Sequence, residues 1–142
     1  GNADHPCADM LRNRIVDLKM EDRIWLTGEV RENEKAWFYR ECEAFVLASK
    51  LEGFGIPAIE AMRMGKPVFV SNLTSLPEVA GEEAFYWKNF DPEEMKNVFE
   101  EGINLFSRDP DKKDRLCRHA LGFSWEETAK NYSVLYQNLL KH

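Results

Sequence analysis

The feature that most constrains the fold of this chain is a short apolar run that leads into a glycine-rich turn and a proline. Residues 44–48 read Ala-Phe-Val-Leu-Ala, which is typical of a strand buried on both faces of a parallel sheet. Gly53 and Gly55 follow, and glycine reaches backbone angles that other residues avoid. Pro57 suits the first position of a helix. The segment therefore predicts a strand, a tight turn and a helix over residues 56–64, ended by the Gly-Lys-Pro that follows.

The same alternation extends along much of the chain. Apolar runs at 23–27, 44–48, 68–71 and 84–87 alternate with stretches of helical pattern at 7–19, 32–41 and 56–64. Such alternation indicates an α/β fold with a parallel sheet built from right-handed crossovers. Ligands bind such open sheets at the carboxyl ends of the strands. We therefore expect the glycine-rich turn, residues 28–30 and residues 71–75 to gather at that edge.

The last third of the chain is predicted to be helical. Asp91 and Asp109 each precede a proline and open one helix. Ser124 begins a capping box for a third helix. The apolar stripe of this last helix is formed by Tyr132, Leu135, Tyr136 and Leu139. We expect Phe123 and Trp125 to pin it to the sheet.

Two glutamates with seven residues between them flank the helix start. Glu52 precedes the turn, and Glu60 lies about one turn inside the helix, where side chains lean toward the N-terminus. The free N–H groups and the dipole at that helix end stabilise an anion. A carboxylate repels phosphate but accepts hydrogen bonds from hydroxyl groups. The arrangement therefore suits a ligand with a phosphate between two hydroxyl-rich rings, such as a phosphorylated sugar.

The signature segment, residues 52–62, reads Glu-Gly-Phe-Gly-Ile-Pro-Ala-Ile-Glu-Ala-Met and resembles the paired-glutamate signature of the family 4 retaining glycosyltransferases, or glycosyltransferase group 1. The resemblance continues in order through residues 22–30, 65–71, 76–79 and 123–126 and covers the chain from Glu21 onward. It implies a GT-B fold, in which two Rossmann-like domains face each other across a cleft. Residues 1–142 match only the C-terminal, donor-binding domain, a Rossmann-like parallel sheet flanked by helices with a helical C-terminal tail.

The resemblance also implies a role for each residue of the signature segment. Glu60 would bind the ribose hydroxyls of a nucleotide, and Glu52, the catalytic position, would bind hydroxyls of the donor sugar near the reacting carbon. The resemblance implies that the backbone of Gly53, Phe54, Gly55 and Ile56 holds the diphosphate or sugar of the donor. It also implies that Gly28 and Val30 lie beside the base. The substrate would be a nucleotide-diphosphate sugar, and we expect no metal ion and no cofactor.

Other parts of the family's active site are expected to lie outside this sequence. An Arg and a Lys that neutralise the donor diphosphate, and an N-terminal domain that supplies the acceptor site, would precede residue 1. Lys50 is one candidate for a replacement cation, although a solvated lysine is the simpler interpretation. We therefore expect a fragment, inactive alone, of a hexosyltransferase that acts on a glycan or lipid acceptor in cell-surface polysaccharide synthesis. The alternatives are a non-catalytic regulatory module that binds a nucleotide or sugar phosphate, and an α/β interaction domain without a ligand.

Composition restricts the partners and the compartment. The formal net charge of −6 argues against a nucleic-acid binder and against docking on anionic lipid. Any membrane association, at the inner membrane face, would reside in the absent half. Cys7, Cys42 and Cys117 are far apart and contain no Cys-x-x-Cys pair, so neither a disulfide framework nor a zinc site is indicated. We expect a cytoplasmic protein.

Overall fold

The computed structural model describes residues 6–140 of the chain. Its internal contacts divide the chain into two compact units, Gly1–Phe38 and Tyr39–His142, and each is described by itself. The first unit contains α1, Pro6–Asp17, and most of α2, Glu32–Glu41, which continues into the second unit. Both helices were predicted from the sequence. The predicted end of α1, at residue 19, lies two residues beyond its end in the structure, Asp17.

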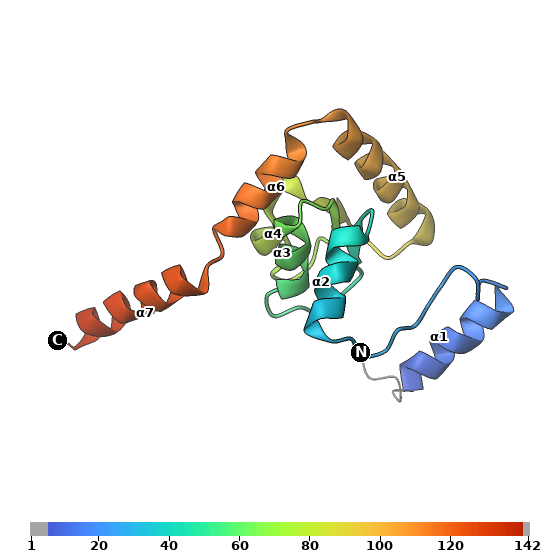
Figure 1. The fold of residues 1–142 in the computed structure, drawn as a ribbon, viewed down its shortest axis with the longest axis horizontal. Helices are drawn as coiled ribbons and strands as arrows, with labels where there is room; N and C mark the ends of the chain where they lie inside the picture. Colours follow the sequence, from blue (N-terminus) through green and yellow to red (C-terminus); the bar gives the residue numbers. More distant parts are fainter. Residues whose placement is uncertain (1–5, 141–142) are drawn as a thin grey trace. The chain divides into compact units, whose positions relative to one another are not determined.

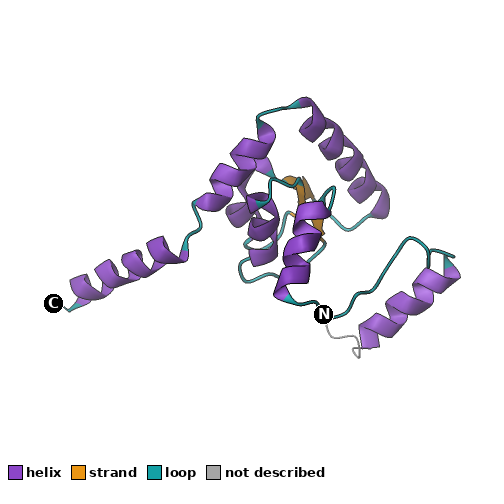
Figure 2. Cartoon of the chain, viewed as in Figure 1, coloured by secondary structure: helices purple, strands orange, loops and turns teal. Residues whose placement is uncertain are grey.

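The second unit is built on a parallel three-stranded sheet in the order β1-β2-β3 (Figure 2). The strands are β1, Phe45–Leu47, β2, Val68–Ser71, and β3, Phe85–Trp87. Val46 of β1 lies opposite Phe69 of β2, and Phe69 in turn lies opposite Phe85 of β3. These strands lie where the apolar runs predicted them, and their parallel pairing confirms the crossover topology.

The central strand β2 is buried along its whole length because helices cover both faces of the sheet. Val68 and Val70 join a core cluster with residues of α3, α4 and α6. The ring of Phe69, which lies between these two valines, stacks on Phe85 with 4.9 Å between the ring centroids. Gly102 of α5 packs closely on the same ring, since a Cβ added there would lie 2.8 Å from Cζ of Phe69. Neighbouring residues of a strand point to opposite faces, so α5 packs on the face opposite to that cluster.

The helices of this unit begin and end at sequence signals. Figure 1 shows α3 and α4 beside α6, and α3 contacts both of them. Asp91 caps α5, where it accepts hydrogen bonds from the N–H groups of Glu93 and Glu94, and Ser124 caps α7 by accepting from Glu127. The helices are α3, Ile56–Arg63, α4, Leu76–Ala80, the short 3₁₀ helix η1, Gly81–Glu83, α5, Pro92–Arg108, α6, Lys112–Leu121, and α7, Trp125–Leu139.

Two predictions about apolar residues are wrong. Residues 23–27 form no strand, and the Trp25 side chain is 73% exposed. A strand requires a pairing partner, which a local apolar run does not itself supply. Trp125 is 83% exposed and does not pin α7, whereas Phe123 packs against the core cluster as expected.

An ion cluster joins α6 to η1. Glu83 accepts hydrogen bonds from Lys112 at 3.1 Å and from Arg115 at 2.7 Å, and Arg115 also donates to Asp109 at 2.6 Å. Burial alone would raise the pKa of Glu83, but the hydrogen bonds from these two cations outweigh it and lower that pKa below its usual value. The hydrogen bond from Arg115 likewise lowers the pKa of Asp109.

We expect these carboxylates to make the fold sensitive to acid. A lowered pKa stabilises the folded state fully above the unfolded-state pKa, about 4.3 for glutamate, and this stabilisation is lost as the pH falls through the folded-state pKa. Glu83→Gln should therefore reduce the pH dependence of the free energy of unfolding, measured by urea denaturation. Glu82→Gln, at an exposed neighbour in the same 3₁₀ helix, is the control and should retain it. The idea fails if Glu83→Gln keeps the full acid dependence.

Candidate functional site

The turn before α3 depends on a left-handed glycine. Gly55 is the N-cap of α3 with φ 97° and ψ 38°, and Pro57 occupies the second helical position. A side chain at Gly55 would be strained at this φ, and its Cβ would lie 2.7 Å from Cδ2 of Leu76 in α4, which would have to shift. Gly55 also has no side chain with which to cap the helix. Pro57 has no N–H, and the Ala58 N–H donates to the Gly55 carbonyl at 2.9 Å. The anion site at this helix start stays a prediction.

The segments that follow β1 and β2 are joined by side-chain hydrogen bonds. The Ser71 hydroxyl donates to the Ser49 carbonyl at 2.6 Å. The Ser75 hydroxyl donates to the Glu52 carbonyl at 3.1 Å, and the Glu52 N–H donates to Thr74 Oγ1 at 3.3 Å. The signature segment and residues 71–75 therefore do meet at the carboxyl edge, the ends of β1 and β2.

Thr74 is held in an unfavourable backbone conformation at this edge. Its φ is 54°, which is uncommon for a β-branched residue and costs conformational energy. The contact from the Glu52 N–H to its hydroxyl accompanies that conformation. The sequence placed residues 71–75 at this edge, but only the tertiary structure shows that the Thr74 hydroxyl accepts from the Glu52 N–H.

Both predicted glutamates belong to this region, and each is held by different contacts. Glu52 is half-buried in the loop, where Thr74 and Ser75 fix its backbone. Glu60 is the fifth residue of α3, half-buried, and its Oε2 accepts a hydrogen bond from the Tyr39 hydroxyl at 3.0 Å. Tyr39 was not predicted as a site residue. No sequence signal indicated it, because the burial of Tyr39 and its contact with Glu60 arise only in the tertiary structure.

The other residues of the turn differ in exposure. Gly53 lies in open space, since a Cβ added there would meet no atom within 4 Å. The Phe54 ring packs edge-to-face on Phe123, with 5.6 Å between the ring centroids, and remains 44% exposed. Ile56, the first residue of α3, is 49% exposed. Gly53, Phe54 and Ile56 are therefore exposed at the turn, whereas Gly55 between them is buried.

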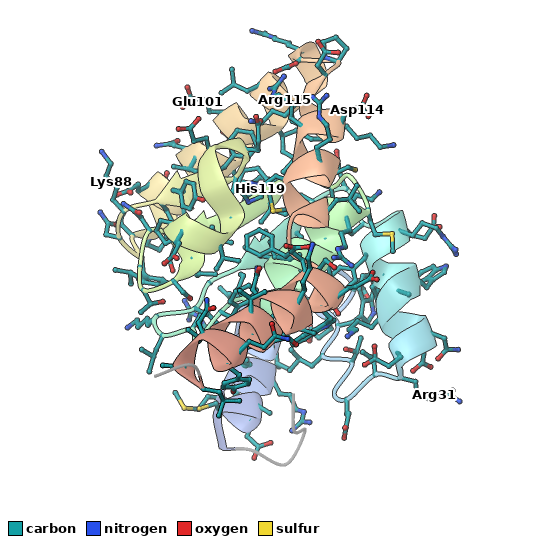
Figure 3. All side chains as sticks on the ribbon, turned by 90° about the vertical axis from the view of Figure 1, so that its left-hand side faces the viewer. Arg31, Lys88, Glu101, Asp114, Arg115 and His119 are labelled. Atoms are coloured by element: carbon teal, nitrogen blue, oxygen red, sulfur yellow. The ribbon has the colours of Figure 1, made fainter. Side chains whose placement is uncertain are left out.

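The C-terminal end of α6 contacts Phe123, whose ring packs on Phe54 of the turn. His119 packs on Phe123, with 5.4 Å between the ring centroids, and its Nε2 lies 2.8 Å from the Val79 carbonyl oxygen. Arg63, at the end of α3, donates to the carbonyls of Ala120 and Phe123. His119 and Arg115 both lie on α6 (Figure 3). Helix α6 thus contacts Phe123, which packs on Phe54 of the turn, and also carries Arg115 of the ion cluster.

Three residues that the sequence predicted near the site take no part in the contacts described above. Gly28, with φ 70°, and the half-buried Val30 belong to the first unit, so their place beside a base stays a prediction. Lys50 is exposed, and its Nζ lies 5.4 Å from the centroid of the Phe90 ring. Its solvation agrees with the simpler interpretation.

Within residues 6–140, no group of three or more His, Cys, Asp and Glu side chains is arranged to hold a metal ion. The expectation of a metal-free site stays a prediction. No helix in the same residues combines the length and the apolar character that crossing a bilayer requires.

Comparisons with known proteins agree on one family. A family model described as "Glycosyl transferases group 1" matches residues 3–121. The serotype-specific mannosyltransferase WbdA of Escherichia coli is 35% identical over 107 residues, which are 75% of this chain and 13% of WbdA. The O-antigen chain mannosyltransferase RfbU of Salmonella typhimurium is 32% identical over 116 residues, 82% of this chain and 32% of RfbU. The chain thus spans less than a third of the length of either relative.

A solved structure shows the fold. The catalytic domain of starch synthase IV from Arabidopsis thaliana, solved with ADP and acarbose, superimposes with a TM-score of 0.75 at 18% identity. The match covers 98% of this chain and 31% of that one. The expected fold, the Rossmann-like C-terminal half of a GT-B protein with a helical tail, is confirmed.

The two glycines of the turn should respond differently to the same substitution. Gly55→Ala places a Cβ against Leu76 and forces alanine to a positive φ, so we expect it to lower the free energy of unfolding by about 1–3 kcal/mol. Gly53→Ala meets no neighbour and should change it by no more than about 1 kcal/mol. Urea denaturation of both variants measures this difference. Equal effects would contradict the steric role of Gly55.

Proposed function

Because the chain belongs to the group 1 glycosyl transferases, we propose that it forms the donor-binding part of a retaining glycosyltransferase that takes a nucleotide-diphosphate sugar. The observation that carries the proposal is the turn at the carboxyl edge. There a left-handed Gly55 opens α3 between Glu52 and Glu60, with the backbone accessible at Gly53.

The diphosphate would bind at the start of α3. The N-cap residue Gly55 offers no side-chain acceptor, and a helix N-terminus favours negative charge. Pro57 lacks an N–H and the Ala58 N–H donates to the Gly55 carbonyl, so the helix dipole and the backbone of the turn would supply most of the stabilisation. The charge on the diphosphate increases as the bond to the sugar breaks. Donors that are already oriented stabilise this charge without rearrangement, which is a large term in catalysis. No metal ion is required in this scheme, and upstream cations of the whole protein would add to the same effect.

The two glutamates would recognise the rings on either side of the diphosphate. Glu60 would accept hydrogen bonds from ribose hydroxyls, as the signature implies, from a backbone fixed by the buried neighbours Ile59 and Ala61. Glu52 would accept hydrogen bonds from the sugar hydroxyls beside the reacting carbon. Its backbone is tied at both its N–H and its carbonyl, and this restraint supports a role that needs an accurately placed carboxylate.

The relatives narrow the choice of sugar and product. WbdA and RfbU are both named as mannosyltransferases, and RfbU acts on an O-antigen chain. We therefore propose that the whole protein transfers a hexose, with mannose the first to be tested, during synthesis of a cell-surface polysaccharide. An N-terminal domain would supply the acceptor site. The wide spacing of Cys7, Cys42 and Cys117 in the sequence, with no Cys-x-x-Cys pair among them, supports a cytoplasmic location.

A binding titration tests the donor site. UDP-, GDP- and ADP-hexoses are titrated into the full-length protein that contains these residues, and we expect one nucleotide class to bind. Glu60→Ala should weaken that binding about 10- to 100-fold, because hydrogen bonds to a charged acceptor are lost. Glu101→Ala, at an exposed position of α5 (Figure 3), is the matched control and should bind normally. Unchanged affinity in Glu60→Ala would count against the ribose assignment.

A kinetic measurement tests the catalytic role of Glu52. We expect Glu52→Gln to lower kcat at least about 100-fold, while the affinity for the nucleoside diphosphate without its sugar changes little. Glu60→Ala should act mainly on KM. Binding without any turnover in the wild-type protein would instead favour a non-catalytic regulatory module.

A further inference from the structure

Tyr39 is the buried aromatic residue that contacts a predicted ligand-binding carboxylate. Its side chain is 8% exposed, at the point where α2 enters the second unit. The hydroxyl donates to Glu60 Oε2 at 3.0 Å, across 21 residues of sequence. The ring packs edge-to-face on Phe45 of β1, with 5.6 Å between the centroids. The ring that bears this hydroxyl is thus packed against a residue of strand β1.

The two partners differ in their freedom. A glutamate side chain has three torsions and occupies several rotamers when partly exposed, whereas a packed tyrosine has two torsions and little freedom. The Glu60 backbone is already fixed, because Ile59 and Ala61 on either side of it are buried. The orientation of the carboxylate therefore depends on the groups that contact its oxygens, and Tyr39 is one of these.

A carboxylate has about four lone-pair directions, and the tyrosine hydroxyl occupies one of them. A donor held at Oε2 restricts the rotamers of the side chain and thereby limits the directions in which its remaining lone pairs point. Two neighbouring hydroxyls on one face of a five-membered ring can donate to such an oriented group. A freely rotating carboxylate would first have to be immobilised by the ligand, which weakens binding.

We infer that Tyr39 is a positioning residue that orients Glu60 toward the vicinal hydroxyls of the nucleotide ribose and so sets the preference of the site for ribonucleotides. The inference rests on the proposed function, in which Glu60 binds those hydroxyls. Tyr39 itself touches no reacting atom. Its effect should therefore appear only with ligands that carry the two hydroxyls.

The experiment compares ribonucleotides with analogues that lack the hydroxyls. UDP, GDP and ADP, each with its 2′,3′-dideoxy analogue, are titrated into the full-length protein that contains these residues. Tyr39→Phe keeps the ring and its packing on Phe45 but removes the donor. We expect it to weaken binding of the preferred ribonucleotide about three- to tenfold and to leave the dideoxy analogue unchanged, so that the affinity ratio narrows.

A second tyrosine gives a matched control. The Tyr86 hydroxyl in β3 donates to the Gly81 carbonyl at 2.6 Å and is half-buried. Tyr86→Phe thus makes the same chemical change at a hydrogen bond that does not involve Glu60, and it should leave the affinity ratio at the wild-type value. In a Glu60→Ala background, Tyr39→Phe should have no further effect on the ratio, because the group that it orients is gone.

The outcomes separate this inference from the proposed function. If the wild-type protein prefers ribonucleotides and Tyr39→Phe keeps the full preference, the positioning role is wrong while the donor site stands. An equal narrowing in Tyr86→Phe would also overturn it, since the effect would then be a general loss of stability. If the wild-type protein binds none of the three nucleotides, the proposed function and the positioning role fail together.

Discussion

The hydrogen bond from the Ser71 hydroxyl to the Ser49 carbonyl is the contact on which the site depends. Ser71 is the last residue of the central strand and is 1% exposed. A hydroxyl buried at that depth would be costly without a partner. Its bond fixes the end of β2 to the chain leaving β1, and the loops that continue from both strands start from this shared position.

From that position the site is built mostly from backbone. Gly55 turns the chain into α3 and fits against Leu76, while the hydroxyls of Thr74 and Ser75 hold the backbone of Glu52. The cost of a left-handed turn and of a strained threonine is offset by burial of the strands behind them. Such a site is rigid before any ligand arrives, which suits binding to backbone N–H groups.

Charged side chains have two separate tasks in this unit. The cluster around Arg115 lies between α6 and η1 and stabilises the fold. Glu52 lies in the loop at the carboxyl edge and Glu60 lies in α3, and in the proposed function both bind hydroxyl groups of the donor. Phe123 connects the two regions, because it follows α6 and packs on Phe54 of the turn.

Local chemistry in the sequence was enough to predict the strands β1 to β3, the start of α3 and the capped helices. Each depends on neighbours along the chain, through the glycine turn, a proline or a capping side chain. The paired glutamates were found in the same way. Residues 23–27 and Trp125 were predicted wrongly because pairing and burial depend on distant partners.

The sequence by itself therefore determined the three strands of the second unit, its longer helices, the turn between its two glutamates and the family to which the chain belongs. Only the tertiary structure decided which side chains hold those glutamates. Tyr39 reaches Glu60 across 21 residues, and Thr74 reaches Glu52 across 22. No local pattern specifies such contacts, because they arise when the sheet brings separate segments of the chain to the same place.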